Sequence, residues 1–316
     1  MLIQFDQVTL QYNKHKALDN VSFSIDQGEI VGLLGHNGAG KTTIMKLLTG
    51  YLESTHGHVY VDGLCMDRDL HVIQSKMGYL PENCPLWPDM SIIEFLLYQA
   101  TLKGISKSEL DDQVLDVIKR THLIEKATQS IGTLSKGYRQ RVGVANAILN
   151  KPKIIILDEP TNGLDPTQTF NMRALIQELA KTSTVILSTH VLQEVEAVCD
   201  RVIIVRAGEI VTDKKINELN QINGLRVTVD QNEQTMQVLC NDLIGADAIQ
   251  LMSVDKNLYQ YILKADVELA PKISERILQA GYQLFQITPE KQNLETLFKE
   301  DYVVHVNESD GMKNVN

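Results

Sequence analysis

The sequence predicts an α/β protein with two domains: a larger one built on buried parallel strands, and a small α+β domain after it. Three observations support this fold class. Residues 153–157 and 184–187 are short apolar runs of the kind found in parallel strands that are buried on both faces. A glycine-rich segment after residues 29–34 joins a strand to a helix that starts near Thr42. From Gly224 onward the pattern restarts as β-α-β-β-α-β, the order of a ferredoxin-like sandwich.

The composition is that of a globular protein. Of the 316 residues, 43% are hydrophobic and 22% are charged, which excludes the disordered and fibrous classes. No stretch approaches the roughly 18 consecutive apolar residues that cross a bilayer, and residues 1–6 lack the basic start of a signal peptide. We therefore expect a cytoplasmic protein. The net charge of −10 gives no overall basic field, so no nucleic-acid partner is expected.

The charge distribution indicates a domain boundary near residue 220. Residues 220–316 hold 8 basic and 14 acidic side chains, so they carry −6 of the total charge of −10. We predict a first domain over residues 1–219, with a helical subdomain at about 83–149, and an accessory α+β domain over 220–305. Residues 306–316 are polar and are predicted to be a disordered tail.

The elements of the first domain follow from alternating and helical hydrophobic patterns. The expected strands are residues 2–10, 21–25, 29–34, 58–63, 153–157, 184–187, 201–205 and 209–212. The turns between the first three strands are expected at Asn13, at Asp19-Asn20 and at residues 26–28. Ser91 and Glu94 have the spacing of a helix-capping box, within a mainly helical stretch from about residue 82 to 149. Further helices are expected over residues 110–118 and 134–149.

The second domain has a clear pattern of elements but no recognisable chemical motif. Its expected strands are residues 225–230, 248–255, 258–265 and 283–288, and its expected helices are residues 233–243 and 269–281. A last helix is expected over residues 293–304.

The strongest chemical signal is a phosphate-binding loop. Residues 35–42 fit the pattern GxxxxGK(S/T) between a strand and a helix, and the rival dinucleotide pattern GxGxxG is absent. Glycines allow several backbone N–H groups to face one anion, and the helix start adds partial positive charge. Lys41 can bring an ammonium to the β- and γ-phosphates, and the Thr42 hydroxyl can ligate Mg²⁺.

A second signal is a buried strand that ends in two carboxylates, Asp158 and Glu159. Beside a phosphate loop, Asp158 can hold magnesium and Glu159 can orient or deprotonate an attacking water. His190 follows the strand at residues 184–187, at the edge where ligands bind in open α/β sheets, and it can donate a hydrogen bond to a γ-phosphate.

A third signal is a second anion site at the start of a helix. Ser135 is an expected N-cap, and Gly137 permits close backbone approach. One nucleotide has no obvious use for two distant helix starts of one subunit. Two subunits that face each other head to tail can each supply one of them.

With these motifs the sequence resembles the ATP-binding subunits of ABC transporters over about residues 2–219. Residues 35–43 resemble their Walker A loop, residues 154–159 their Walker B strand, residues 134–140 their LSGGQ signature, and residues 163–165 their D-loop. His190 corresponds to the switch histidine, and Tyr12 to the aromatic residue that stacks on adenine. Within the family, the sequence is most similar to single-domain exporter-type ATPases, such as those of gliding motility and of copper-linked nitrous oxide reductase maturation.

The resemblance implies a fold, a reaction, a set of site residues and partners. The fold is a P-loop NTPase with a mixed RecA-like sheet, an antiparallel β subdomain and a helical subdomain. The reaction is ATP hydrolysis coupled to transport, with Glu159, His190 and Lys41 as catalytic residues. The implied partners are a second copy of the chain and a separately encoded integral-membrane permease, which would hold the protein at the inner face of the cell membrane. The nucleotide-binding residues that it implies are Tyr12, Gly35, His36, Asn37, Gly38, Ala39, Gly40, Lys41, Thr42, Thr43, Glu82, Ser135, Gly137, Asp158 and Asp165, of which Thr42, Glu82 and Asp158 would hold Mg²⁺.

The sequence departs from the family pattern at three positions. Lys136 stands where the signature has glycine, Tyr138 stands where it has glutamine, and Glu82 stands at the Q-loop glutamine. A glutamate can ligate magnesium but cannot donate an amide hydrogen bond. The family's permease-coupling surface would begin at residue 83, with Leu86 and Trp87 as candidates to receive a permease helix. A core position for Trp87 is an equally open alternative.

Other interpretations remain open at this point. A non-transport ABC ATPase that acts on ribosomes or nucleic acid is the alternative function, although a single set of motifs and the negative charge disfavour it. The accessory domain is expected to support dimers or regulate activity. The four cysteines form no CxxC pair, which disfavours a structural zinc site, and His56 and His58 are expected to face solvent.

Overall fold

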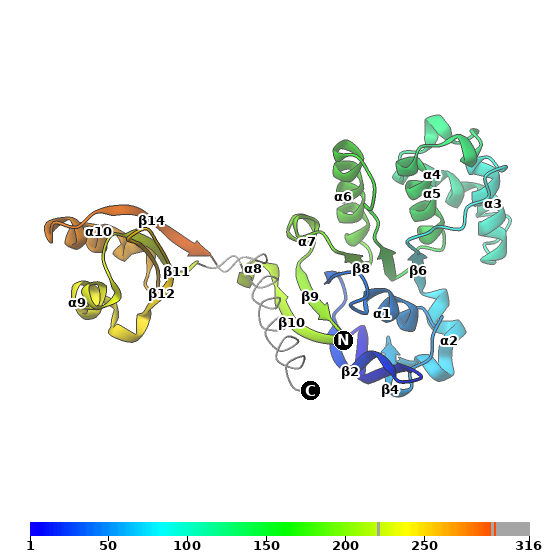
Figure 1. Ribbon diagram of the computed structural model, residues 1–316. Coiled ribbons are helices and arrows are strands. Elements are labelled where there is room, and N and C mark those ends of the chain that lie inside the picture. Colours follow the sequence, from blue (N-terminus) through cyan, green and yellow to red (C-terminus); the bar gives the residue numbers. More distant parts are fainter. Residues whose placement is uncertain (220–221, 292–293, 295–316) are drawn as a thin grey trace. The chain divides into compact units, whose positions relative to one another are not determined.

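A computed structural model describes residues 1–219, 222–291 and 294 of the chain (Figure 1). The chain divides into two units, Met1–Ile216 and Asn217–Asn316. Of the predicted helix at 293–304 only residue 294 is described, and the predicted tail at 306–316 lies outside the described residues.

The first unit is built on a six-stranded mixed sheet in the order β10-β9-β3-β8-β7-β6. Its strands are β3 (Ile30–Leu34), β6 (Met77–Leu80), β7 (Ile154–Asp158), β8 (Thr184–Thr189), β9 (Arg201–Arg206) and β10 (Glu209–Lys215). Every neighbouring pair is parallel except the β9–β10 hairpin. All residues of β3, β7 and β8 are buried, as the continuous apolar runs predict. Their carboxyl ends therefore meet at one edge of the sheet.

A second, antiparallel sheet in the order β2-β1-β4-β5 precedes and interrupts the first in sequence. Its strands are β1 (Ile3–Tyr12), β2 (His15–Ile25), β4 (His56–Val61) and β5 (Leu64–Cys65). The predicted turn at Asp19-Asn20 is wrong, because β2 continues through both residues. Asn20 has the positive φ of a turn residue, but its amide donates to the Thr9 hydroxyl, and the pairing with β1 shifts register nearby. The local signal marks an irregularity within a strand.

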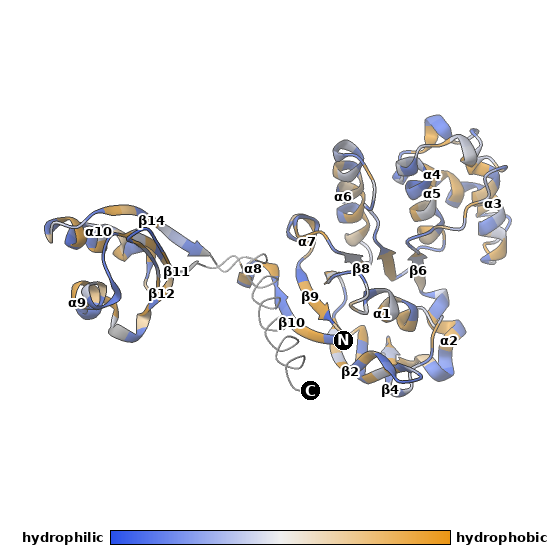
Figure 2. Ribbon diagram, in the orientation of Figure 1, coloured by the Kyte–Doolittle hydropathy of each residue, from blue (hydrophilic) through white to orange (hydrophobic). Residues whose placement is uncertain are grey.

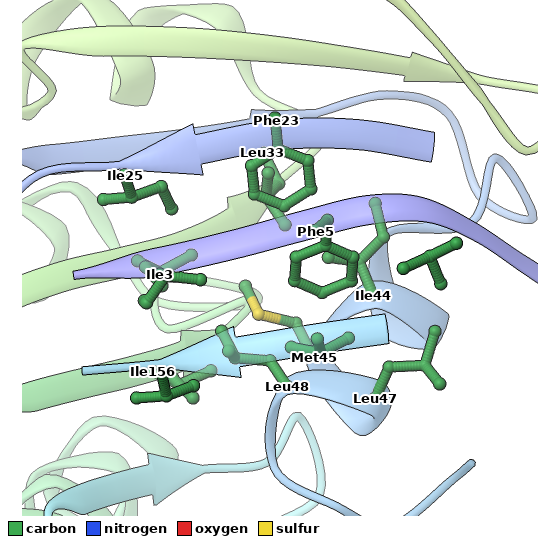
Figure 3. Close-up of a cluster of buried hydrophobic side chains, with 14 of the residues drawn as sticks. Ile3, Phe5, Phe23, Ile25, Leu33, Ile44, Met45, Leu47, Leu48 and Ile156 are labelled. Carbon is green, nitrogen blue, oxygen red and sulfur yellow. The ribbon is translucent and has the colours of Figure 1, made fainter. Parts of the chain in front are cut away.

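Helix α1 (Lys41–Leu48) lies between these two sheets (Figure 3). Phe5 and Phe23 of the antiparallel sheet stack with their ring centroids 4.5 Å apart. From the opposite side, Leu33 and Ile156 of the mixed sheet belong to the same buried cluster. The helix contributes its buried side chains Ile44, Met45, Leu47 and Leu48 to this cluster. The helix that follows the phosphate loop is thus fixed on two sides by apolar contact.

Three helices form the subdomain that the sequence places at about residues 83–149: α3 (Ile92–Leu102), α4 (Leu110–Arg120) and α5 (Lys136–Ile148). The capping box is present in both directions, since Ser91 accepts from the Glu94 amide and Glu94 accepts from the Ser91 amide. The helices carry both hydrophobic and hydrophilic residues (Figure 2). Among the described residues, none of the helices combines the length and the apolar character that a membrane crossing requires.

Several elements have no counterpart in the sequence-based predictions. They are α2 (Met66–Ser75), β5, β6, α6 (Pro166–Ala180), α7 (Leu192–Val198), α8 (Ile216–Leu219), and the 3₁₀ segments η1 (Ile124–Lys126), η2 (Ile131–Thr133), η3 (Ala246–Ala248) and η4 (Val267–Leu269). Most are short, so that few residues carry a periodic pattern, and β6 has only four. Helix α6 did have a local start signal, because Asp165 is its N-cap and Pro166 opens it.

The second unit has the predicted β-α-β-β-α-β order. It consists of β11 (Ile222–Val229), α9 (Glu233–Ile244), β12 (Ile249–Asp255), β13 (Leu258–Leu263), α10 (Ala270–Gln279) and β14 (Leu284–Lys291). The antiparallel sheet order β14-β11-β13-β12 places the strands as fourth, first, third and second, which is the ferredoxin-like arrangement. Its core combines strand residues such as Val227 and Tyr261 with helix residues such as Ile273. The predicted fold class is confirmed for both units.

Gly78 of β6 provides a test of how tightly the helical subdomain packs on the mixed sheet. A Cβ atom at this position would lie 2.1 Å from the backbone oxygen of Ala147 in α5. The helix backbone can move away only at a large cost in free energy. We expect Gly78→Ala to lower the free energy of unfolding by about 3 kcal/mol, measured by urea denaturation. In the control Gly104→Ala the new methyl meets no atom, and only the positive φ of 77° costs stability, about 1 kcal/mol. Equal losses in both variants would contradict this packing.

Candidate active site

The phosphate loop connects the end of β3 to the start of α1. Gly40 is the N-cap of α1, with φ of 116°, and no side chain caps this helix. The first N–H groups of α1 are therefore available to an anion, and a side chain at Gly40 would strain the loop. This is the arrangement in which a helix start binds phosphate.

Lys41 is the cation of this loop and is almost fully buried. Its Nζ donates to the backbone oxygens of Gly35 at 2.7 Å and His36 at 3.2 Å, and it lies 3.8 Å from Glu159 Oε1. Burial lowers the pKa of Lys41, and the nearby carboxylates, Glu159 first, oppose that shift. An anion in the loop would supply the charge compensation that the backbone oxygens provide only in part.

The two carboxylates at the end of β7 are held by the neighbouring strand β8. Ser188 Oγ donates to Asp158 Oδ1 at 2.5 Å and accepts from the Glu159 amide at 3.1 Å. Glu159 has a φ of 49°, which is uncommon for a residue with a side chain and is a strained geometry of the kind that clusters at active sites. Burial raises the pKa of Asp158, and the Ser188 hydrogen bond opposes the shift.

His190 and Glu159 form a close pair of side chains that can exchange protons. His190 Nδ1 and Glu159 Oε2 are 2.9 Å apart, with the Glu159 side chain buried and the imidazole partly exposed. Burial raises the pKa of Glu159, while the contact with His190 and the charge of Lys41 lower it in part. A raised pKa makes a carboxylate a stronger base, so Glu159 beside an accessible histidine is suited to accept a proton from water.

A cavity of about 410 Å³ brings most of the predicted nucleotide-binding residues together. Among the predicted residues, its lining includes Tyr12, Asn37, Gly38, Gly40, Lys41, Thr42, Thr43, Glu82, Glu159 and His190. Gly35, His36, Ala39 and Asp158 belong to the same loop and strand end but do not line it. Sequence reasoning missed His15, Ala17 and Asn162, which do line it. Of these, His15 could have been predicted from the sequence, because it lies directly across the β1–β2 turn from Tyr12.

The available metal ligands at this cavity are oxygen atoms. Of the residues that line it, Thr42 offers a hydroxyl and Glu82 a carboxylate, and Glu82 Oε1 lies 3.4 Å from Asn162 Nδ2. Asp158 does not line the cavity, but it offers a buried carboxylate at the end of β7. Such hard oxygen donors fit Mg²⁺ better than they fit a soft transition metal.

The remaining predicted residues lie outside the cavity. Ser135 is the N-cap of α5 and accepts from the Tyr138 amide, and Asp165 caps α6 by accepting from the Gln168 amide at 2.8 Å. Gly137 is buried, and the Gln168 side chain would meet any Cβ placed there at 2.6 Å. Within one chain, the second anion site therefore does not join the first.

Comparison with known proteins identifies the family. The family model described as "ABC transporter" matches residues 18–162. Over 306 residues the chain is 33% identical to an uncharacterized ABC transporter ATP-binding protein, YxlF of Bacillus subtilis (strain 168), covering 96% of this chain and 100% of that protein. The chain belongs to the ATP-binding subunits of ABC transporters. It binds ATP and hydrolyses it for transport.

Two further relatives of this ABC subunit are informative. The bacitracin transport ATP-binding protein BcrA of Bacillus licheniformis is 30% identical, over 94% of this chain and 96% of that protein. A solved dimeric structure of the ATP-binding cassette MJ0796, in a post-hydrolysis state bound to ADP and Pi, is 28% identical and has a TM-score of 0.63. It covers 68% of this chain and 98% of that chain.

The raised pKa of Glu159 predicts how stability of this ABC subunit depends on pH. Because the folded state holds the Glu159 proton more tightly than the unfolded state, folding stability falls as pH rises from 4.5 through the folded pKa. Glu159→Gln removes this loss. Without nucleotide, we expect the variant to melt about 2–4 °C above wild type at pH 8, the effect of roughly 1 kcal/mol.

The difference should shrink steadily as the pH is lowered through the folded pKa of Glu159 toward its ordinary value of 4.5, because wild-type Glu159 then becomes neutral as well. Differential scanning calorimetry of both proteins across this range measures it. A variant that is less stable than wild type at pH 8 would contradict the sign of the shift.

Proposed function

We propose that two copies of this chain close head to tail around two ATP molecules and drive a separately encoded membrane permease. One observation carries the dimer: Lys41, Glu159 and His190 share a cavity, while Ser135 and Gly137 lie elsewhere in the same chain. Rotation of a second copy can bring its α5 helix start to the open cavity. The dimeric form of the related cassette with ADP and Pi supports a dimer of this chain.

In the proposed dimer each residue has a defined part in binding. Tyr12, which is 49% exposed at the cavity, stacks on the adenine ring. The loop from Gly35 to Thr43 surrounds the phosphates with backbone N–H groups, and Lys41 moves its ammonium from the Gly35 oxygen to the β- and γ-phosphates. Thr42, Glu82 and Asp158 would hold Mg²⁺, which neutralises phosphate charge when bound. Asp165 and the loop before it contact the second copy.

In the proposed reaction Glu159 orients the attacking water and accepts its proton. His190, 2.9 Å from Glu159, fixes that carboxylate and donates to the γ-phosphate. Ser135 and Gly137 of the second copy bind the same phosphate from the opposite side through a hydroxyl and helix N–H groups. Hydrolysis removes the group that both copies share, so the dimer reopens.

Glu159→Gln tests this assignment. Gln keeps the shape of the side chain but cannot accept a proton, so we expect ATP binding to persist while turnover falls at least about a hundredfold. The variant should form a stable dimer with ATP, seen by size-exclusion chromatography with light scattering. In the double variant Glu159→Gln/Ser135→Arg, the bulky cation at the α5 start should prevent that dimer while ATP binding to the monomer remains. Normal turnover in Glu159→Gln would show that another residue is the base.

The permease is proposed to dock on the helical subdomain near Trp87. Trp87 is 45% exposed, and its ring packs against Tyr98 of α3, with centroids 4.9 Å apart and Tyr98 itself 41% exposed. Leu86 beside it is half-buried. An exposed pair of aromatic rings in a monomer is a typical anchor for a partner helix, so the exposure favours docking over a core position.

Export is the proposed direction, and the inner face of the cell membrane is the proposed location. Two relatives support export: BcrA is named for bacitracin transport, and LnrL of Bacillus subtilis (strain 168), which is 28% identical, is named for linearmycin resistance. The narrower similarity to gliding-motility and copper-linked ATPases stays a prediction, as does a supporting or regulatory role of the second unit in the dimer.

Trp87→Ala/Tyr98→Ala tests the docking surface. We expect the native protein, tagged and expressed in its own cells, to fractionate with membranes and to co-purify with an integral membrane protein. The double variant should lose at least about tenfold of that association while keeping its basal ATPase rate, because neither residue lines the cavity. Leu115→Ala on α4, an exposed apolar residue of the same subdomain, is the matched control. Co-purification with ribosomes or nucleic acid in place of a membrane protein would favour the non-transport alternative.

A further inference from the structure

A second group of chemically capable side chains lies in the antiparallel sheet. His58 is on β4, Cys65 is on β5, and Asp67 is in the first turn of α2. One ligand atom from each lies within 4.8 Å of the other two. Among residues 1–219, 222–291 and 294 this is the only such group of three His, Cys, Asp or Glu side chains. None of the three lines the nucleotide cavity.

The backbone brings these residues together. A two-residue turn, Asp62-Gly63, has positive φ at both positions and joins β4 to β5, so that Tyr60 pairs with Cys65. Paired residues of an antiparallel ladder point to the same face, and His58, two residues before Tyr60, shares that face. Helix α2 starts directly after Cys65 and adds Asp67. The sequence spacing H-x6-C-x-D is not a familiar metal motif, and only the hairpin makes the three residues neighbours.

Asp67 already contacts the side chains of the other two residues. Its Oδ2 atom lies 2.9 Å from His58 Nδ1 and 3.7 Å from Cys65 Sγ. The Cys65 amide donates to Asp69 Oδ2 at 3.3 Å, which holds the backbone of the cysteine in place. His58 and Asp67 have side chains that are 57% and 42% exposed, so an ion can reach them from solvent.

The donor set selects the kind of ion. A thiolate, an imidazole and a carboxylate suit Zn²⁺, whereas Mg²⁺ and Ca²⁺ prefer oxygen donors alone. The two negative ligands balance the charge of a divalent cation, and three protein ligands leave the fourth tetrahedral position to water. We propose that His58, Cys65 and Asp67 form a surface site for a zinc-class divalent cation, separate from the nucleotide site.

Cobalt titration of the full-length, reduced protein without nucleotide tests the proposal. Co²⁺ reports on its ligands, and a thiolate ligand gives a charge-transfer band in the near ultraviolet. We expect that band to saturate at one Co²⁺ per chain and to disappear when Zn²⁺ is added. Because no cysteine lines the nucleotide cavity, Co²⁺ bound there cannot produce the band.

Variants assign the ligands. Cys65→Ser should abolish the charge-transfer band, and His58→Asn and Asp67→Asn should each weaken Co²⁺ binding by at least about tenfold. Cys84→Ser, which changes another half-buried free thiol, should leave the band unchanged. Zn²⁺ should raise the melting temperature of wild type and of Cys84→Ser but not of Cys65→Ser, since ligand that binds only the folded state stabilises it.

Two results would overturn the proposal. If wild type gives no charge-transfer band, His58 and Asp67 are a surface ion pair beside an uninvolved thiol. If the band persists in Cys65→Ser, the cobalt is held by another cysteine. Circular dichroism spectra that match wild type show that a lost signal is not a lost fold.

Discussion

The burial of α1 between two sheets is the constraint on which the active site depends. Ile44, Met45, Leu47 and Leu48 are held from one side by the Phe5–Phe23 pair and from the other by Leu33 and Ile156. Each fully buried side chain of this kind contributes about 1.5–3 kcal/mol, so the position of the helix is fixed tightly. The phosphate loop ends at the first residue of this helix, and its N–H groups are therefore aimed before any ligand arrives.

The same packing buries charged side chains at the site, and this burial is electrostatically unfavourable. The carboxyl ends of parallel strands β7 and β8 meet at one edge, which places Asp158, Glu159 and His190 together beside Lys41. Burial shifts the pKa of Lys41 down and the pKa of both carboxyls up, so every one of these groups is less stable in its charged form than in water. Ser188 and the backbone oxygens of the loop offset part of this cost. Proteins commonly lose stability where a strained backbone and buried charges are concentrated at an active site.

Local sequence signals were sufficient to predict a feature wherever all of its residues lie in one short segment. Each of three features depends only on residues adjacent in the chain, and the sequence pattern predicts it: the phosphate loop, the Asp158-Glu159 strand end and the Ser91 capping box. The Asp19-Asn20 turn was predicted wrongly, because a left-handed asparagine can form an irregularity within a strand when the residues before and after it pair with the same neighbouring strand. Short elements such as β6 and α7 gave too few residues for a periodic pattern. His15 and Asn162 reach the cavity only because distant segments meet there.

The sequence by itself determined the family and the fold class, and it predicted which residues bind phosphate and carry out catalysis, because these follow from residue type and spacing along a few segments. The tertiary structure decided which of them act together. It separates Ser135 and Gly137 from the cavity of their own chain, leaves Trp87 and Tyr98 exposed as a pair, and brings His58, Cys65 and Asp67 within reach of one ion. Such proximities depend on strand register, turn geometry and helix packing between residues far apart in the chain, and a linear pattern does not encode them locally.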